Sequence, residues 1–542
     1  MAKKKTQNSK FKTQKLKSKI QKSKPYALLS VSDKSGLDKF AKGLKELGFE
    51  IVSSGGTADF LTKAKIKVTK VQKLTKYPHM LDGRVKTLHP VIHGAILADQ
   101  TNPKHLKELA KYKINPFRIV VCNLYPFEKV ISKADFTHEE AIENIDIGGP
   151  CMVRAAAKNH KSVAIIVDPA DYSLVLDELK NNQGKIPPGM RESLAKKAFE
   201  YTRYYDSVIV KYLYSRGVAE ETLPAQVELQ LEKIQDLRYG ENPHQKAALY
   251  REVKIGSWAM GSQVTRAKQL GGKELSFNNY VDMDAAWSAA NAFADPTIAI
   301  IKHTNPCGLA SDESLVEAYK KAYAGDPVSA FGGIVAANRR IDEETAIEIA
   351  KLFVEVVIAP GYTPKALMVL KGKNNLRIME MGEGSINKPF TGLDIKRISG
   401  GLLLQEPDLA QLGLGEIKVV TTKEPTLEQM EDLFFAWNVA KYVKSNTIVI
   451  ANNKQAIGIG AGQMSRIEAA GLAIQRSRTA VKGAVLASDA FFPFPDVVEF
   501  AGKHGISAII QPGGSKKDQD SIDKANELGI AMVFTGRRHF RH

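Results

Sequence analysis

The chain has 542 residues, which is too long for one ordinary hydrophobic core and predicts two or three domains. Hydrophobic residues make up 44% and charged residues 25% of it, as in soluble globular proteins, and no apolar run approaches the roughly 20 residues that span a bilayer. The three cysteines lie far apart without C-x-x-C spacing, which argues against a disulfide framework or a thiolate metal site and fits a reducing cytoplasm.

Much of the net charge of +18 comes from residues 1–24, which contain ten lysines and no acidic residue. This tail has too few apolar residues to form a core, so we expect it to be disordered. It could be a solvated extension, a transit peptide, or an arm that touches RNA or an anionic membrane, and the sequence leaves these alternatives open. The remaining charge of +8 suits a protein that handles anionic small molecules.

The chain after the tail alternates between strand and helix patterns. A buried strand is predicted over 27–31, followed by the loop 32–34 and by a helix with apolar residues at helical spacing over 37–47. Ser35 is the predicted N-cap of this helix, and Gly48 is its predicted terminator.

Strand–loop–helix units of this kind predict a parallel sheet with helices packed on it. Further strands in this region are predicted over 50–53, 118–122 and 163–167. A polar segment over 215–237 is predicted to be a connector that contains a domain boundary. Beyond the connector, strands are predicted over 298–302, 333–337, 354–359, 447–451, 483–487, 507–511 and 531–534. We find no internal repeat in the sequence.

Common nucleotide-binding and metal-binding motifs are absent. A Walker A loop fails at Ala267 and Glu274, and Gln463 stands where a dinucleotide fingerprint needs its last glycine. Neither H-E-x-x-H nor the signature of zinc deaminases is present. Nothing in the sequence therefore predicts a kinase, a dehydrogenase or a metalloenzyme.

Three segments of the N-terminal half carry residues that suit a phosphate group. Residues 32–34 and 54–57 each precede a predicted helix, where free backbone N–H groups and the helix dipole favour an anion. Residues 84–87 add two cations and a hydroxyl group. Each segment alone is also typical of an ordinary turn, so the prediction of a phosphorylated ligand depends on their combination on one parallel sheet.

Longer runs of sequence resemble a known family. SVSDKSG, SSGGT, DGRVKTLHP, CNLYPF and IDIGGPCMVRAAAKNH resemble the IMP cyclohydrolase part of the bifunctional AICAR transformylase/IMP cyclohydrolase family. LRYGENPHQ, IKHTNPCG, SAFGGIVA, SNTIVIA, GIGAGQMSR, SDAFFPFPD and the terminal RRHFRH resemble its transformylase part. The resemblance implies an α/β fold in which the tail, 1–24, precedes a methylglyoxal synthase-like parallel-sheet domain over 25–222. The transformylase domain, 223–542, would contain two cytidine deaminase-like subdomains.

For the first domain, the resemblance implies a set of residues that hold the nucleotide, chiefly its phosphate: Ser32, Asp33, Lys34, Ser54, Gly55, Gly56, Thr57, Arg84, Val85, Lys86 and Thr87. It implies another set near the base: Cys122, Asn123, Tyr125, Asp146 and Ile147. Lys158 would donate and accept the proton, because ring closure removes a proton from nitrogen and protonates the departing oxygen. Without the resemblance, Lys158 would be interpreted as a solvated helix residue.

For the second domain, the resemblance implies that His303 removes the proton of the attacking amine and that Lys302 and Asn446 stabilise the oxyanion. Lys302 and His303 follow an apolar strand, and ligand crevices lie at the carboxyl ends of strands in open α/β sheets. Without the resemblance, a lone histidine at a strand end is usually structural.

The resemblance also implies residues for both substrates of formyl transfer. The residues that bind AICAR would be Arg238, Tyr239, Gly332, Glu355 and Arg538, with Glu355 at a place where some relatives carry Asp. The residues that bind 10-formyltetrahydrofolate would be Arg466, Ile467, Phe491, Asp496, Ser515 and Lys516. Phe491 suits the flat pterin, although the run F-F-P-F could equally be hydrophobic core. No metal is expected to be required.

The implied protein is a cytosolic homodimeric enzyme of de novo purine biosynthesis, which formylates AICAR to FAICAR and closes FAICAR to IMP. Nucleic acid and membrane are not expected partners. Two alternatives remain open at this point. One is an enzyme of the same fold that keeps a single activity, and the other is an RNA-binding protein led by the basic tail.

Overall fold

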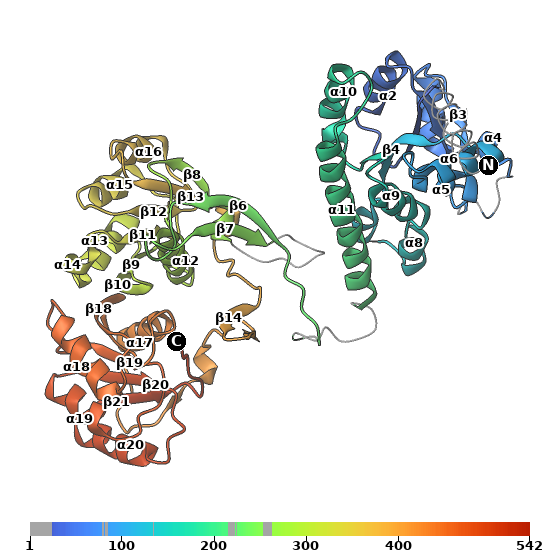
Figure 1. Cartoon of the computed structure of the whole chain (residues 1–542). Helices are drawn as coiled ribbons and strands as arrows, with labels where there is room; N and C mark the ends of the chain where they lie inside the picture. The colour runs from blue at the N-terminus through green and yellow to red at the C-terminus, as the bar shows by residue number, and fades with distance from the viewer. Residues whose placement is uncertain are drawn as a thin grey trace. The chain divides into compact units, whose positions relative to one another are not determined.

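The computed structural model describes residues 24–77, 81, 85–133, 135–214, 223, 225–252 and 263–542. The predicted tail therefore lies outside the described residues except for Lys24. The chain divides into two compact units near residue 221 (Figure 1), and each is described by itself below. Within the described ranges, no helix combines the length and the apolar character that a membrane crossing requires.

The N-terminal unit is built on a five-stranded sheet, and all neighbouring strands in it are parallel. The strand order is β3-β2-β1-β4-β5. The strands are β1 (Tyr26–Val31), β2 (Glu50–Ser53), β3 (Thr69–Lys70), β4 (Phe117–Asn123) and β5 (Ala164–Ile166). The sheet confirms the predicted α/β class with a parallel N-terminal sheet.

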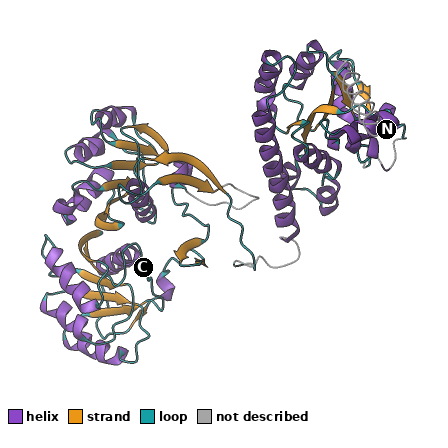
Figure 2. Cartoon of the chain, in the orientation of Figure 1, coloured by secondary structure: helices purple, strands orange, loops and turns teal. Residues whose placement is uncertain are grey.

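Helices cover both faces of this sheet (Figure 2), and each face has its own hydrophobic core. The helices are α2 (Leu37–Glu46), α3 (Gly55–Lys63), α4 (Val71–Thr75), α5 (Pro90–Leu97), α6 (Pro103–Tyr112), α7 (Phe127–Ile131), α8 (His138–Glu143), α9 (Gly148–Lys158), α10 (Tyr172–Asn181) and α11 (Pro188–Tyr214).

The start of α2 differs from the prediction. Gly36, with φ 66°, is the N-cap, and no side chain caps the helix. Ser35 was the wrong residue because its hydroxyl donates instead to Asp33 Oδ1 at 2.7 Å. The predicted terminator is confirmed, since Gly48 has φ 82° and its N–H donates to Lys45 O at 2.9 Å.

The C-terminal unit is built on a twelve-stranded mixed sheet with the order β16-β21-β20-β19-β17-β18-β10-β9-β11-β12-β13-β8. In chain order its strands are β8 (Lys268–Gly271), β9 (Thr297–Lys302), β10 (Asn305–Ser311), β11 (Ile334–Ala337), β12 (Val356–Ala359), β13 (Arg377–Glu380), β16 (Lys418–Val419), β17 (Ile448–Asn452), β18 (Gln455–Gly460), β19 (Val485–Ser488), β20 (Ala508–Gln511) and β21 (Ala531–Phe534). Its helices are α12 (Phe277–Ala290), α13 (Leu315–Gly325), α14 (Pro327–Ala330), α15 (Glu343–Ala350), α16 (Pro364–Lys371), α17 (Leu427–Ala440), α18 (Arg466–Arg476), α19 (Asp496–Lys503) and α20 (Asp518–Glu527).

Two antiparallel hairpins lie outside the large sheet. They are β6 (Leu231–Leu237) with β7 (Ala247–Glu252), and β14 (Asp394–Ile398) with β15 (Gly401–Gln405). The predicted connector over 215–237 was therefore wrong in its last third. Strand β6 is exposed along nearly its whole length, so its sequence lacks the apolar alternation of a half-buried strand.

The C-terminal unit contains an internal repeat that our sequence analysis missed. The order helix, antiparallel strand pair, helix, strand, helix, strand, helix, strand runs from α12 to β13, with the short α14 added after α13, and again from α17 to β21. The two copies stay in register at an offset of 150 residues, as Trp287 and Trp437 illustrate. The copies meet where β10 pairs antiparallel with β18, at Ala310 and Gln455.

A single hydrophobic cluster spans both copies. Trp287 from α12 and Trp437 from α17 belong to it, together with alternate residues of the strands beneath, such as Ile301 and Val449. The opposite face of each copy has a separate core. The two repeats therefore share one core on the face covered by α12 and α17.

Candidate active sites

The strand order of the N-terminal unit reverses at β1 and β4, whose carboxyl ends are neighbours. The chain leaves β1 toward β2 on one side, while β4 lies on the other side of β1. Such a reversal of strand order opens a crevice in which parallel α/β sheets bind ligands. We use the name β1–β4 crevice for a set of residues at this edge: Ser32, Asp33, Ser54, Gly55, Lys86, Thr87, Asn123 and Asp146.

Asn123, the last residue of β4, holds the loop after β1. Its Oδ1 accepts the N–H groups of Ser32 at 2.7 Å and Asp33 at 2.8 Å. Its Nδ2 donates to Asp33 O at 3.1 Å. Its Oδ1 and one N–H of its Nδ2 are thus used within the protein, which makes Asn123 a brace of the crevice.

The segment Ser54 to Thr57 joins β2 to the start of α3. Thr57 Oγ1 accepts from Val31 N at 3.0 Å and donates to Val31 O at 2.9 Å, so this side chain is structural. Ser54 is 3% exposed, and its hydroxyl has no hydrogen-bond partner in the described structure. The first N–H groups of a helix lack partners within the helix, so this start of α3 suits an anion.

Lys86 and Thr87 reach the same crevice from another loop. A Cβ atom added at Gly55, which has φ 52°, would lie 3.1 Å from Lys86 Nζ. A Cβ atom added at Gly148, the first residue of α9, would lie 2.7 Å from Thr87 Oγ1. Both glycines therefore allow a close approach of side chain to backbone.

Asp146 precedes α9 and accepts the N–H of Gly149 at 2.8 Å through Oδ1. Burial raises the pKa of Asp146, while the hydrogen bond from Gly149 and the charge of Lys86 oppose this rise. Tyr125 is 47% exposed, and its pKa is raised by burial and by the charge of Asp146. Ile147 is 58% exposed.

Two other predicted residues of this unit do not join the crevice in the same way, and a third cannot be compared with them. The Cys122 side chain is buried in the core with Sγ 3.8 Å from Gly149 O, and burial raises its pKa far above the usual range. Lys158 is exposed at the last position of α9, so it lies about 15 Å from Gly148 at the helix start. Arg84 lies outside the described residues.

In the C-terminal unit, Lys302 and His303 lie at the carboxyl end of β9, as predicted. His303 and Thr304 form the two-residue turn between β9 and β10, with φ values of 54° and 62°. His303 is exposed, and Lys302 Nζ donates to Phe331 O at 2.8 Å, beside Gly332. Glu355 lies one strand further along and forms an ion pair with Arg377.

The register of the sheet brings the second repeat to this edge. Ile448, at the start of β17, pairs with Gly460 of β18 and with Ser488 of β19. The segments after β18 and after the neighbouring parallel strands β19 and β20 therefore lie beside the segment before β17. We use the name His303 edge for the predicted residues that are collected there: Lys302, His303, Gly332, Glu355, Asn446, Arg466, Ile467, Phe491, Asp496, Ser515 and Lys516.

Asn305 connects the two repeats at the His303 edge. Its Nδ2 donates to His303 O at 3.1 Å, and its Oδ1 accepts from Lys444 N at 3.0 Å, two residues before Asn446. The Nδ2 of Asn446 itself donates to Gln463 O at 3.0 Å and to Met464 O at 3.1 Å. An oxyanion contact from Asn446 would require its amide to leave one of these carbonyls.

Arg466 and Arg538 lie around one aromatic ring. Their guanidinium carbons are 5.9 Å and 4.5 Å from the ring centre of Phe540. Arg466 also lies 3.7 Å from the fully buried Asp489, between Nη2 and Oδ1. Burial lowers the pKa of Arg466, and Asp489 opposes this shift. Our sequence analysis missed Phe540, although the terminal R-R-H-F-R-H run contains it.

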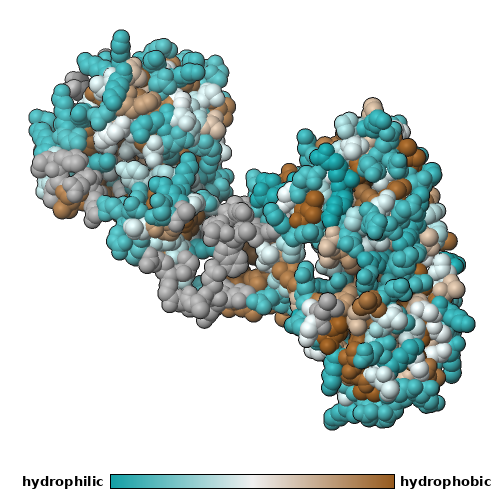
Figure 3. Space-filling model, turned by 180° about the vertical axis from the view of Figure 1, so that it is seen from behind, coloured by the Kyte–Doolittle hydropathy of each residue, from teal (hydrophilic) through white to brown (hydrophobic). Residues whose placement is uncertain are grey.

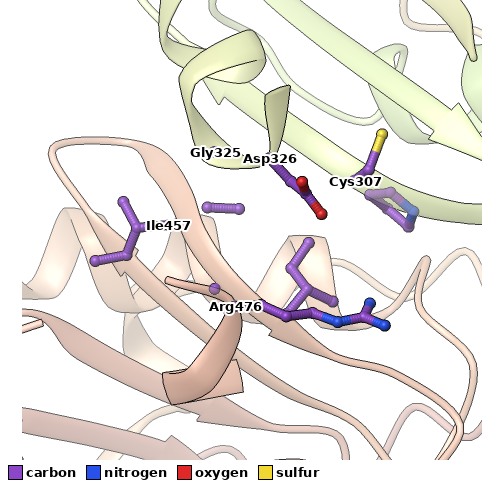
Figure 4. A pocket seen from close by; sticks show the side chains of 9 residues that line it. Cys307, Gly325, Asp326, Ile457 and Arg476 are labelled. Carbon is purple, nitrogen blue, oxygen red and sulfur yellow. The ribbon is translucent and has the colours of Figure 1, made fainter. Parts of the chain in front are cut away.

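Arg238 and Tyr239 follow β6 and contact each other. Arg238 Nη2 donates to Tyr239 OH at 2.8 Å, and its guanidinium carbon is 4.7 Å from the ring centre. A small pocket of about 270 Å³ at the seam between the repeats contains none of the predicted residues; Cys307 and Asp326 line it from one copy, and Ile457 and Arg476 from the other (Figure 4). Across the described part of the chain, no three His, Cys, Asp or Glu side chains are grouped as metal ligands.

Comparison with known proteins finds family models that match parts of both units. A family model for the AICARFT/IMPCHase bienzyme matches residues 156–476, and one for the MGS-like domain matches residues 36–151. The chain is 51% identical over 516 residues to the bifunctional purine biosynthesis protein PurH of Acetivibrio thermocellus, covering 95% of this chain and 99% of that protein. Proteins of the same name from Thermoanaerobacter sp. and Oceanobacillus iheyensis are 52% and 48% identical, with the same coverage.

The chain belongs to the AICARFT/IMPCHase bienzyme family. It is a bifunctional enzyme of de novo purine biosynthesis, an AICAR formyltransferase and an IMP cyclohydrolase. The family uses formyltetrahydrofolate. The predicted family and function are thus confirmed.

Proposed function

We propose that the two reactions occur at separate sites, ring closure at the β1–β4 crevice and formyl transfer at the His303 edge. The observation that carries the second site is the link through Asn305, which joins the turn of His303 to the segment of Asn446. Residues from both copies of a duplicated fold are thereby collected at one edge of one sheet.

In formyl transfer, the AICAR amine attacks the formyl carbon of 10-formyltetrahydrofolate. His303, exposed on its turn, removes the amine proton as the new C–N bond forms and gives a tetrahedral intermediate. The intermediate then collapses: the bond from the formyl carbon to N10 of the folate breaks, N10 takes the proton back from His303, and FAICAR and tetrahydrofolate result. Lys302 is the better-placed donor to the formyl oxygen, because one hydrogen bond to Phe331 leaves two of its three N–H groups. Asn446 takes part once its amide is released.

Arg238, Tyr239, Gly332, Glu355 and Arg538 would bind AICAR. Arg466, Ile467, Phe491, Asp496, Ser515 and Lys516 would bind the folate. Phe540 supports this division, because the guanidinium groups proposed for the two ligands flank the same ring.

In ring closure, the start of α3, with Lys86 and Thr87, would hold the FAICAR phosphate. Asp146, Ile147 and Tyr125 would face the base. Lys158 is the proton carrier that the family resemblance implies, but Lys86 Nζ lies in the crevice beside Gly55. Lys34 Nζ lies there too, where it donates to Ser32 O at 3.2 Å. The role of Lys158 remains a prediction, which is tested below.

We further propose a cytosolic homodimer in which neither reaction requires a metal. Apolar patches on the C-terminal unit (Figure 3) and exposed side chains on the two hairpins, such as Leu231 and Leu403, suit burial against a second copy. The free cysteines fit a reducing compartment. Sedimentation would show the dimer, and both activities should survive a chelator.

The central test is His303→Ala. Loss of a positioned general base typically costs about 10²–10⁴-fold in rate, so IMP formation from AICAR should fall by that factor. Closure of supplied FAICAR should be unchanged. His504→Ala, at the partly exposed C-cap of α19, is the control. Normal formylation by His303→Ala would contradict the proposed role.

A further inference from the structure

We propose that Asp282 of α12 is a positioning residue for formyl transfer, because its carboxylate clamps the turn that presents His303. The inference rests on the role of His303 proposed above. It concerns how the side chain is held in place, which the sequence of the turn does not explain.

The turn is sterically unfavourable for its residues. Two-residue hairpin loops with positive φ at both positions favour Asn-Gly or Gly-Gly, because L side chains meet their own backbone there. This turn carries His303 and Thr304 at φ 54° and 62°. A β-branched residue with positive φ is a genuine outlier, so something outside the turn must stabilise it.

Asp282 supplies that stabilisation. Its Oδ2 accepts the N–H of His303 at 3.1 Å, and its Oδ1 accepts the N–H of Thr304 at 2.7 Å. Strands β9 and β10 pair at Lys302 and Asn305, so these two amides belong to the loop and not to the ladder. A charged acceptor that takes both amides fixes the direction in which the turn projects.

The clamp is anchored at both ends. Asp282 lies on α12, whose residue Trp287 packs in the core shared by the two repeats. On the other side of the turn, His303 O accepts from Asn305, which also holds the Asn446 segment. The position of His303 relative to Asn446 therefore depends on one carboxylate and one amide.

The second repeat contains the same clamp without a predicted site residue. Asp432 of α17 accepts from Asn453 N at 2.8 Å through Oδ2 and from Lys454 N at 2.7 Å through Oδ1. Both turn residues have φ 51°. This turn lies at the opposite sheet edge, where Lys454 O accepts the N–H of Ser311 at the end of β10. Asp432 is thus a control for the structural effect of losing a clamp.

The experiment compares Asp282→Ala with Asp432→Ala in the full-length enzyme. Small misplacements of reacting groups cost up to about 10²-fold, so we expect Asp282→Ala to lower kcat for formyl transfer about 10- to 100-fold. The KM for AICAR should change less than about threefold, because the turn positions the base and not the bound nucleotide. Asp432→Ala should keep kcat within about twofold.

A rescue separates positioning from packing. Glycine adopts positive φ without a steric cost, so Thr304→Gly in the Asp282→Ala background should restore about tenfold of the lost kcat. If Asp282→Ala loses its near-UV circular dichroism, Asp282→Asn, which keeps one acceptor oxygen and the shape, takes its place. It should show a smaller loss and the same rescue.

Three results would overturn the proposal: kcat within twofold in the Asp282 variant, an equal loss in the Asp432 variant, or no rescue by glycine. His303→Ala measured alongside separates this proposal from the one on which it rests. If His303→Ala formylates AICAR at the normal rate, His303 is not the general base, and the proposed role of His303 is wrong. If His303→Ala is slow, Asp282→Ala should add less than twofold to it, since both changes act through one group.

Discussion

Asn123 and Asp33 are hydrogen-bonded in both directions, with Asp33 N donating to Asn123 Oδ1 at 2.8 Å and Asn123 Nδ2 donating to Asp33 O at 3.1 Å. The end of β4 and the loop after β1 therefore move as one body. Because the two strands border the reversal of strand order, the width of the crevice depends on this contact.

Asn123→Ala should weaken FAICAR binding without affecting formyl transfer. Leaving partly buried N–H groups unsatisfied costs about 1–3 kcal/mol, and 1.4 kcal/mol corresponds to a tenfold change in affinity. We expect KM for FAICAR to rise at least about tenfold. Gln100→Ala is the matched control, because Gln100 Nε2 binds Phe117 O at the opposite end of β4. An equal rise in that variant would show that the effect is general.

Comparing Lys158→Ala with Lys86→Ala shows which of the two lysines transfers the proton in ring closure. If the role implied by the family holds, Lys158→Ala should slow closure of FAICAR by about 10²-fold or more, and FAICAR should accumulate from AICAR. Lys161→Ala, three residues further on, is the control. Closure at the normal rate by Lys158→Ala would transfer the role to Lys86, whose loss should then be the larger.

The free energy of unfolding of the N-terminal unit should fall as pH rises and Asp146 loses its proton. Its pKa is raised in the folded state, so the folded protein binds the proton more tightly than the unfolded chain does. Stability from this group is present below the unfolded pKa of about 3.9 and is lost as pH rises through the folded value. Asp146→Asn removes this dependence. The difference in unfolding free energy between variant and wild type should grow in favour of the variant by at most about 1.4 kcal/mol per pH unit. A difference independent of pH would contradict the shift.

Phe540→Ala should impair formyl transfer through both substrates. The ring lies near the guanidinium groups of Arg466 and Arg538, and such contacts contribute about 0.5–2 kcal/mol each. We expect kcat/KM to fall about 5- to 30-fold for each substrate, with ring closure unchanged. Phe199→Ala, which removes a comparable contact with Arg154 in the N-terminal unit, is the control. A loss confined to one substrate would show that only one arginine depends on the ring.

Much of the fold could be predicted because its central strands are short apolar runs between turn residues. The predicted strands 50–53 and 531–534 match β2 and β21, and most others differ by one or two residues at an end. Strands β10 and β18 were missed because they contain glycines. A Cβ atom at Gly308 would collide with Ala322 O, and one at Gly460 with Ala469 O. The helices pack so closely on these strands that glycine is required there, and glycines interrupt the apolar pattern by which a strand is predicted.

The candidate sites were predictable to the extent that local motifs contain them. The loops that begin at Ser32 and Ser54 do meet at one edge of the sheet, and their role in binding stays a prediction. The partners that hold these residues could not be found locally, because Asn305 contacts Lys444 and Asp282 contacts His303 across long stretches of sequence. The repeat did leave a signal, since helix caps at Ser276 and Thr426 precede Trp287 and Trp437 at the same offset. The domain boundary at 222 and 223 stays a prediction.

The core shared by α12 and α17 also bears on synthesis of the chain. When the ribosome has completed the first repeat at Glu380, the residues of α17 and β17 that cover its apolar face are still to come. At about 5–20 residues per second, the roughly 80 residues to Gly460 take about 4–16 seconds. During that interval the nascent first repeat exposes Trp287 and its neighbours, so the order of translation leaves a half-covered intermediate that chaperones would be expected to protect.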